Sequence, residues 1–68
     1  MDQETFNLSI RKFLKMVGVN SQREIELAVQ QALAAGKLKG SETFAARITL
    51  EIPTLGLRVP FEGEIKLK

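Results

Sequence analysis

The spacing of apolar residues changes once along the chain, and this change divides the sequence into a helical part and an extended part. Before Gly36, apolar residues recur every three or four positions, which is typical of amphipathic helices. After Gly40 they alternate with polar residues, which is the period of a strand with one face in water. The sequence therefore predicts an α+β fold with helices first and strands second.

A turn and a capping signal lie inside the helical part. The run Val17-Gly18-Val19-Asn20 predicts a tight turn, because glycine adopts the left-handed conformation that ends many helices. The next four residues, Ser21-Gln22-Arg23-Glu24, have the S-x-x-E form of a capping box, which marks a helix start. We therefore expect two helices, at about residues 3–16 and 22–35, joined as a helix-turn-helix hairpin.

The ends of this pair and its apolar sides are also predicted. Asp2 or Thr5 is expected to cap the first helix, and Gly36 is expected to end the second. Each helix has one apolar stripe, expected to face a core. The stripes consist of Phe6, Ile10, Phe13, Leu14 and Val17 in the first helix, and Ile25, Ala28, Val29, Ala32 and Leu33 in the second.

The extended part reads as a β-hairpin with strands at about residues 44–52 and 57–67. Pro53-Thr54-Leu55-Gly56 supplies the turn. A four-residue loop places Ile52 opposite Leu57, Leu50 opposite Val59, Ile48 opposite Phe61 and Arg47 opposite Glu62. Gly63 interrupts the apolar row of the second strand and predicts a bulge or a close backbone approach.

Two helices packed on one face of this two-stranded antiparallel hairpin make a complete two-layer fold, and 68 residues allow a single domain, residues 1–68. So short a chain is marginally stable alone, and without cysteine it has no disulfide to support it. We therefore expect a homodimer. The free edge of residues 44–52 is one candidate interface, since Pro60 blunts the other strand. The off-stripe residues Leu8, Met16 and Leu27 are a second.

The composition argues against catalysis. The chain has no histidine and no cysteine, the side chains on which most acid–base and nucleophilic chemistry near neutral pH depends. We expect no enzyme activity, no cofactor, no metal site and no small-molecule substrate. Gly36-Lys37-Leu38-Lys39-Gly40 is superficially like a phosphate loop, but it follows a helix instead of opening one, so we interpret it as a helix end and a solvated loop.

The first functional hypothesis is a small non-catalytic interaction module of unknown process that binds itself or another protein. It depends on apolar residues that have no place in the predicted core. These residues are Leu8, Met16, Leu27, Leu38 and Leu55. If they gather on one face, this hypothesis gains support. If the basic side chains instead form an unbroken stripe, the hypothesis of nucleic-acid binding gains support.

The alternative is a nucleic-acid-binding protein resembling a truncated winged helix-turn-helix. Net charge is only +2, but residues 5–23 contain four bases and no acid. In this interpretation, residues of the second helix contact the edges of nucleobases, and the other basic residues contact phosphates. The contact residues are Arg11, Lys12, Lys15, Gln22, Arg23, Lys37 and Lys39. The absence of a third helix and the acids Glu24 and Glu26 count against it.

Localisation is predicted from the start of the chain. Met1-Asp2-Gln3-Glu4 is acidic, and no uncharged apolar run of signal-peptide or membrane-span length follows. We therefore expect a cytoplasmic protein without a membrane partner.

The sequence also resembles a known family. The segments that carry the resemblance are Phe6–Lys15, Val17-Gly18-Val19, Ser21–Glu26, Ala35–Gly40 and Gly63-Glu64-Ile65. They are similar to a family of short bacterial proteins classed only as a domain of unknown function. The resemblance implies a stand-alone cytosolic bacterial protein, and it assigns no catalytic or binding residue.

Overall fold

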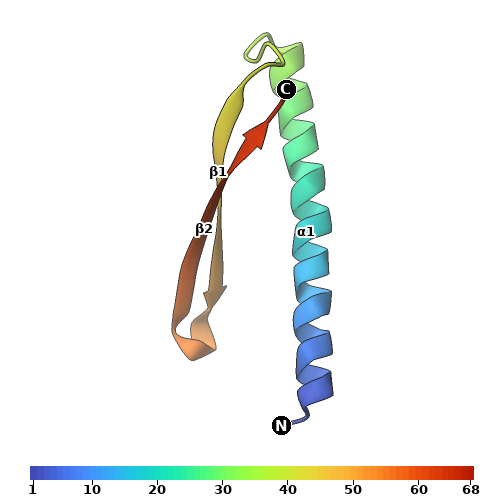
Figure 1. Cartoon of the computed structure of the whole chain (residues 1–68), viewed down its shortest axis with the longest axis vertical. Helices are drawn as coiled ribbons and strands as arrows, with labels where there is room; N and C mark the ends of the chain where they lie inside the picture. The colour runs from blue at the N-terminus through green and yellow to red at the C-terminus, as the bar shows by residue number, and fades with distance from the viewer. The chain divides into compact units, whose positions relative to one another are not determined.

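The computed structural model describes the whole chain, residues 1–68, as one helix followed by a hairpin. The elements are α1 (Gln3–Ala34), β1 (Thr43–Ile52), the 3-10 turn η1 (Pro53–Leu55) and β2 (Leu57–Lys66), and Figure 1 labels the helix and both strands. The chain divides into two compact units, Met1–Lys37 and Leu38–Lys68.

The predicted helix-turn-helix is wrong, because α1 runs without interruption through residues 17–21 (Figure 1). Gly18 does not adopt the left-handed backbone that a turn requires, and Ser21 lies inside the helix instead of capping a new one. A glycine inside a helix costs only about 1 kcal/mol relative to alanine. A single glycine with no nearby proline is therefore too weak a signal to end this helix.

The apolar stripe explains why the helix continues. Leu14 and Ile25 are separated by 11 residues, which is about three helical turns. The two predicted stripes thus fall on the same side of one continuous helix, and Ser21 bridges them, four residues after Val17 and four before Ile25. Ser21 is a polar residue within the stripe, but it lies on the same side of the helix as the apolar residues.

Both ends of α1 follow the predicted chemistry. At the start, the Asp2 carboxylate accepts hydrogen bonds from the amides of Glu4 at 3.0 Å and Thr5 at 3.3 Å. At the end, Gly36 has φ of 75°, and its amide donates to the Leu33 carbonyl at 3.1 Å. The amide of Lys37 donates to the Ala32 carbonyl at 2.9 Å, which completes a Schellman motif. The helix end predicted at Gly36 is confirmed.

The hairpin is confirmed with its register. The structure pairs Ile52 with Leu57, Leu50 with Val59, Ile48 with Phe61 and Arg47 with Glu62. Gly56 closes the turn with φ of 61°, and its amide donates to the Pro53 carbonyl at 3.0 Å. A left-handed glycine at this position lets the strands return in register.

The predicted bulge at Gly63 is wrong, since Gly63 pairs regularly with Ala46 within an unbroken ladder. A Cβ atom built on Gly63 would meet no atom within 4 Å, so no backbone approaches it closely either. The glycine instead leaves a gap beside the small side chain of Ala46. The apolar face of the hairpin therefore projects less at the pair Ala46–Gly63 than at the other pairs.

No residue of the chain is fully buried. The aromatic residues expected in a core remain about half exposed, with Phe6 at 47%, Phe13 at 46% and Phe61 at 59%. On α1, only Val17, Ser21, Ile25, Val29 and Ala32 are partly buried.

Candidate interaction surfaces

The continuous helix places a second set of apolar residues on one face. Going along α1 in steps of three or four, this face, which we call the second face, contains Leu8, Lys12, Met16, Val19, Arg23 and Leu27. Leu8 and Met16 are 55% and 52% exposed. The three residues predicted for self-association, Leu8, Met16 and Leu27, thus share one face of one helix.

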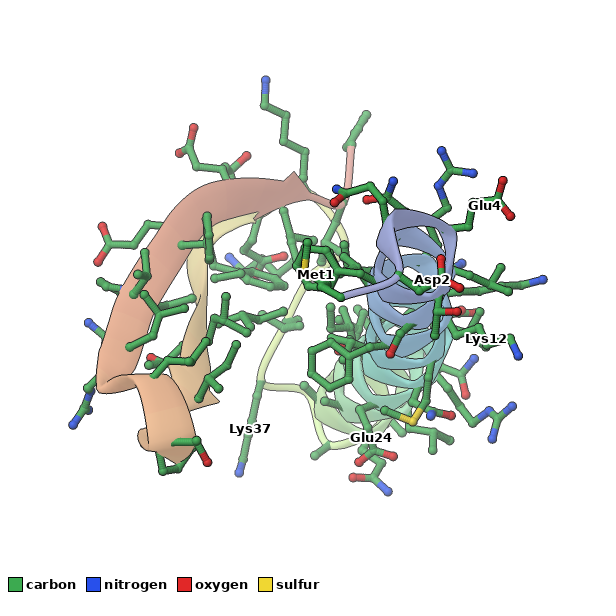
Figure 2. All side chains as sticks on the ribbon, turned by 90° about the horizontal axis from the view of Figure 1, so that it is seen from below. Met1, Asp2, Glu4, Lys12, Glu24 and Lys37 are labelled. Atoms are coloured by element: carbon green, nitrogen blue, oxygen red, sulfur yellow. The ribbon has the colours of Figure 1, made fainter.

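Five of the residues predicted to contact nucleic acid lie on α1, within about a third of its circumference. Lys12 and Arg23 alternate with the apolar residues of the second face, while Arg11, Lys15 and Gln22 lie along its flank. Lys37 belongs to the end of the helical unit, and Lys39 belongs to the hairpin unit. Figure 2 shows Lys12 and Glu24 projecting in different directions around α1. No basic residue lies between Lys15 and Arg23, so the basic side chains of α1 make no unbroken stripe.

The argument that a helix-turn-helix motif would bind nucleic acid also fails. Gln22 and Arg23 were expected at the start of a recognition helix, but both lie in the interior of α1. Of the other leftover leucines, Leu38 is partly buried in the loop after α1, and Leu55 is 71% exposed in η1.

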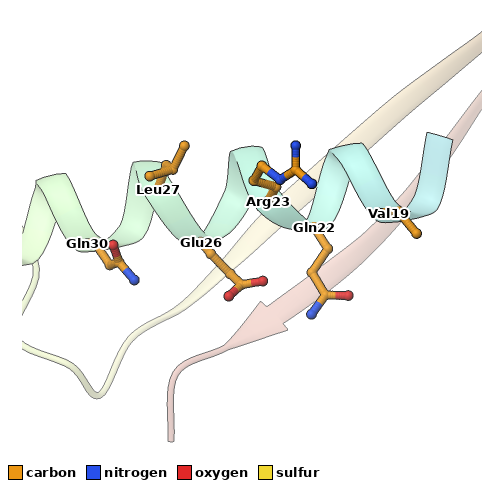
Figure 3. Close-up of a pocket in the computed structure, with 6 residues that line it drawn as sticks. All are labelled: Val19, Gln22, Arg23, Glu26, Leu27 and Gln30. Atoms are coloured by element: carbon orange, nitrogen blue, oxygen red, sulfur yellow. The ribbon is translucent and has the colours of Figure 1, made fainter. Parts of the chain in front are cut away.

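A shallow groove follows the C-terminal half of the second face (Figure 3). It is lined by Val19, Gln22, Arg23, Glu26, Leu27 and Gln30. All six side chains come from one helix, so no second element closes the groove. Pockets for small molecules are usually enclosed and mostly apolar, and this groove is neither. Val19, predicted to lie in a turn, is a surface residue that the sequence prediction missed.

The loop before β1 is held by a carboxylate. Glu42 accepts hydrogen bonds from the amides of Lys39 at 2.8 Å, Gly40 at 2.9 Å and Ser41 at 3.1 Å. Successive amides that converge in this way form an anion-binding concavity, here filled by the chain's own carboxylate. The amide of Lys39 in particular lowers the pKa of Glu42. The interpretation of residues 36–40 as a helix end and loop fits this arrangement.

The hydrogen-bond pattern of the hairpin determines which backbone groups point outward. The Leu67 amide donates to the Glu42 carbonyl at 2.9 Å, one pair beyond the end of the strands. Antiparallel pairs alternate between bonded and non-bonded, so Thr43–Lys66 and every second pair after it are non-bonded. In these pairs the amide and carbonyl groups face away from the partner strand. The outward residues of β1 are Thr43, Ala45, Arg47, Thr49 and Glu51.

The outer edges of the two strands differ in consequence. Pro60 is paired with Thr49, so it is an outward residue, and its ring nitrogen interrupts the outer edge of β2. β1 contains no proline, and all its outward residues carry a free amide. Pro60 therefore removes a hydrogen-bond donor from the outer edge of β2 but no hydrogen bond from the ladder between the strands. This geometry agrees with the prediction that β2 is the strand less able to pair with another chain.

The two faces of the hairpin are chemically distinct. One face has only apolar residues and Gly63, arranged in the pairs Phe44–Ile65, Ala46–Gly63, Ile48–Phe61, Leu50–Val59 and Ile52–Leu57. The other face is mostly polar. On this polar face, Arg47 Nη1 lies 3.7 Å from Glu62 Oε1, and Glu51 is opposite Arg58. Exposed pairs of this kind stabilise little, but they fix the order of charges along the face.

The remaining features of the chain concern metal ligands, membrane spans and titratable groups. No three acidic side chains gather to hold a metal ion. No helix combines the length and apolar character needed to cross a bilayer. The pKa of Asp2 and that of Glu42 are lowered, and in both the principal cause is a hydrogen bond from the chain's own backbone.

The fold and its surfaces define a small α+β protein in which a long helix precedes a β-hairpin. All residues, 1–68, match the sequence profile of DUF6494, a family of unknown function, and the chain belongs to this family. No curated protein and no solved structure matches the chain.

Proposed function

We propose that the protein is a non-catalytic interaction module that associates with a second copy of itself. The observation that carries this proposal is that the chain consists of one long helix and one two-stranded hairpin, and neither of these units buries a residue of its own. Fifteen large apolar side chains remain exposed. Isolated two-stranded hairpins are marginal in water, and so small a chain gains most from surface covered by association.

The distribution of charge supports this function over nucleic-acid binding. Leu8, Met16 and Leu27 lie together on the second face and separate its bases from one another. In the groove of Figure 3, the acid Glu26 lies beside Arg23 and Leu27. A groove binder usually presents a continuous basic surface, so no specific observation favours the second function.

Thermal unfolding at several protein concentrations tests the proposal. If association supplies the missing burial, the midpoint temperature rises with concentration, because dilution favours the separated and unfolded chains. Between about 5 and 500 μM the shift should amount to several degrees. A midpoint independent of concentration over this range would show that a single chain is stable without a partner.

A further inference from the structure

We propose that two copies pair through the outer edges of their β1 strands, forming one four-stranded antiparallel sheet. This inference rests on the proposed function and identifies its interface. β1 is the strand whose outward amides, at Thr43, Ala45, Arg47, Thr49 and Glu51, are all free. An edge of this kind is a template for another strand.

The other edge explains why the assembly stops at two copies. When two β1 strands pair, the edges left at the sides of the sheet are both β2 strands. Each of them is interrupted by the outward ring of Pro60. Pairing of β1 with β1 is the same contact on both copies, so it closes on itself and leaves no open site for a third chain.

The charges on the polar face select the register. If Thr49 lies on the two-fold axis, Arg47 is opposite Glu51 of the second copy, and this pair occurs twice. Within each chain, Arg47 is already opposite Glu62 and Glu51 opposite Arg58. The rows across the four strands then read Glu62, Arg47, Glu51, Arg58, so that the charge alternates at every step. Opposite charges in facing positions stabilise a sheet.

Other registers lack this charge pairing. With the axis one residue away, at Ile48 or at Leu50, Arg47 is opposite Thr49 or Pro53 of the second copy and no opposite charges face each other. An axis at Arg47 would place two arginines directly opposite each other, and like charges in this position are destabilising. With the axis at Thr49, two threonines meet instead, and the residue pairs Arg47–Glu51, Thr49–Thr49 and Glu51–Arg47 exchange about six backbone hydrogen bonds. The apolar faces of the two hairpins lie on the same side, because a two-fold axis perpendicular to the sheet preserves its faces.

Amide hydrogen exchange on the full-length protein tests the interface without a substitution. In a single hairpin, the inward amides of β1 are protected and the outward ones exchange freely. In the paired sheet, Arg47, Thr49 and Glu51 become protected as well, and we expect their exchange to slow at least tenfold. Free exchange at these three amides, at a concentration where the protein is dimeric, would overturn the inference.

A proline substitution on each edge provides a matched pair of variants. Thr49→Pro removes an outward amide of β1, whereas Glu64→Pro removes an outward amide of β2, and neither removes a bond between β1 and β2. Circular dichroism verifies that each variant retains its fold. By sedimentation, we expect Thr49→Pro to weaken dimerisation at least tenfold and Glu64→Pro to leave it unchanged.

The outcomes separate this inference from the proposed function. If folded Thr49→Pro dimerises as tightly as the unmodified chain, the β1 interface is refuted while self-association through another surface stands. If the unmodified chain is a monomer, both proposals fall. If Thr49→Pro does not fold, the exchange of Arg47, Thr49 and Glu51 in the unmodified protein decides the question.

Discussion

Thr49 of β1 lies directly opposite Pro60 of β2 in a non-bonded pair of the hairpin. Because both residues direct their backbone nitrogens outward, this one pair sets the difference between the two edges of the sheet. The edge at Thr49 can accept another strand, and the edge at Pro60 cannot do so without losing a hydrogen bond. The position of Pro60 in the ladder is therefore the reason that we expect the proposed pairing at the edge of β1.

A disulfide test follows from the register around Thr49. The chain has no cysteine, so a single introduced cysteine reports only on contact between copies. In Thr49→Cys the two Cα atoms would lie about 5.5 Å apart, within the range of a disulfide. In the control Ala45→Cys they would be separated by eight residues, or about 26 Å. Mild oxidation followed by non-reducing electrophoresis should show a covalent dimer for Thr49→Cys alone, and equal yields would contradict the register.

The continuity of α1 is tested by substituting glycines. Gly18 has an ordinary helical backbone, and a Cβ atom there would meet nothing within 4 Å. Gly18→Ala should therefore raise the free energy of unfolding by up to about 1 kcal/mol. The control Gly56→Ala should lower it by about 1 kcal/mol, because φ there is 61°. Chemical denaturation measures both values, and destabilisation by Gly18→Ala would indicate a turn at this position.

Ser21→Ala separates a continuous helix from a capped one. As the cap of a second helix, Ser21 would contribute roughly 1 kcal/mol, which the alanine variant would lose. Inside α1, alanine is the better helix former, so we expect a gain of up to about 0.5 kcal/mol. Denaturation of the two proteins measured side by side gives the sign, and a clear loss would count against the helical position of Ser21.

Acidification should loosen the loop before β1. Because the folded pKa of Glu42 is lowered, its carboxylate contributes stability above its unfolded pKa of about 4.3, and this contribution disappears as the pH falls through the lowered folded value. The amide signals of Lys39, Gly40 and Ser41 should shift together over this acidic range in NMR spectra. Glu42→Gln should abolish the shared titration, and Glu64→Gln should preserve it. Independent behaviour of the three amides would contradict the shared carboxylate.

The sequence predicts the hairpin in detail, because its information is local. Alternation with period two sets which face each side chain occupies, and the turn at Pro53–Gly56 then leaves one register in which the apolar rows coincide. The cap at Asp2 and the helix end at Gly36 are predicted for the same reason. Each depends on residues within a few positions of one another.

The sequence does not settle the middle of α1, because Gly18 and the S-x-x-E run at Ser21 fit either a turn or a helix interior. The decisive signal is the 11-residue spacing from Leu14 to Ile25, which only a continuous helix brings to one side. The role of Glu42 could not be predicted either. It depends on the backbone at Gly40, where φ is 100°, and no periodic pattern records that angle.

Sedimentation equilibrium on the unmodified protein tests the central claim most directly. One chain has a mass of 7.6 kDa. At high micromolar concentration we expect a particle of about twice that mass, with no larger species, because pairing of the two β1 edges leaves only β2 edges interrupted by Pro60. A particle of 7.6 kDa at that concentration would contradict the claim that a second copy covers the surfaces this chain exposes.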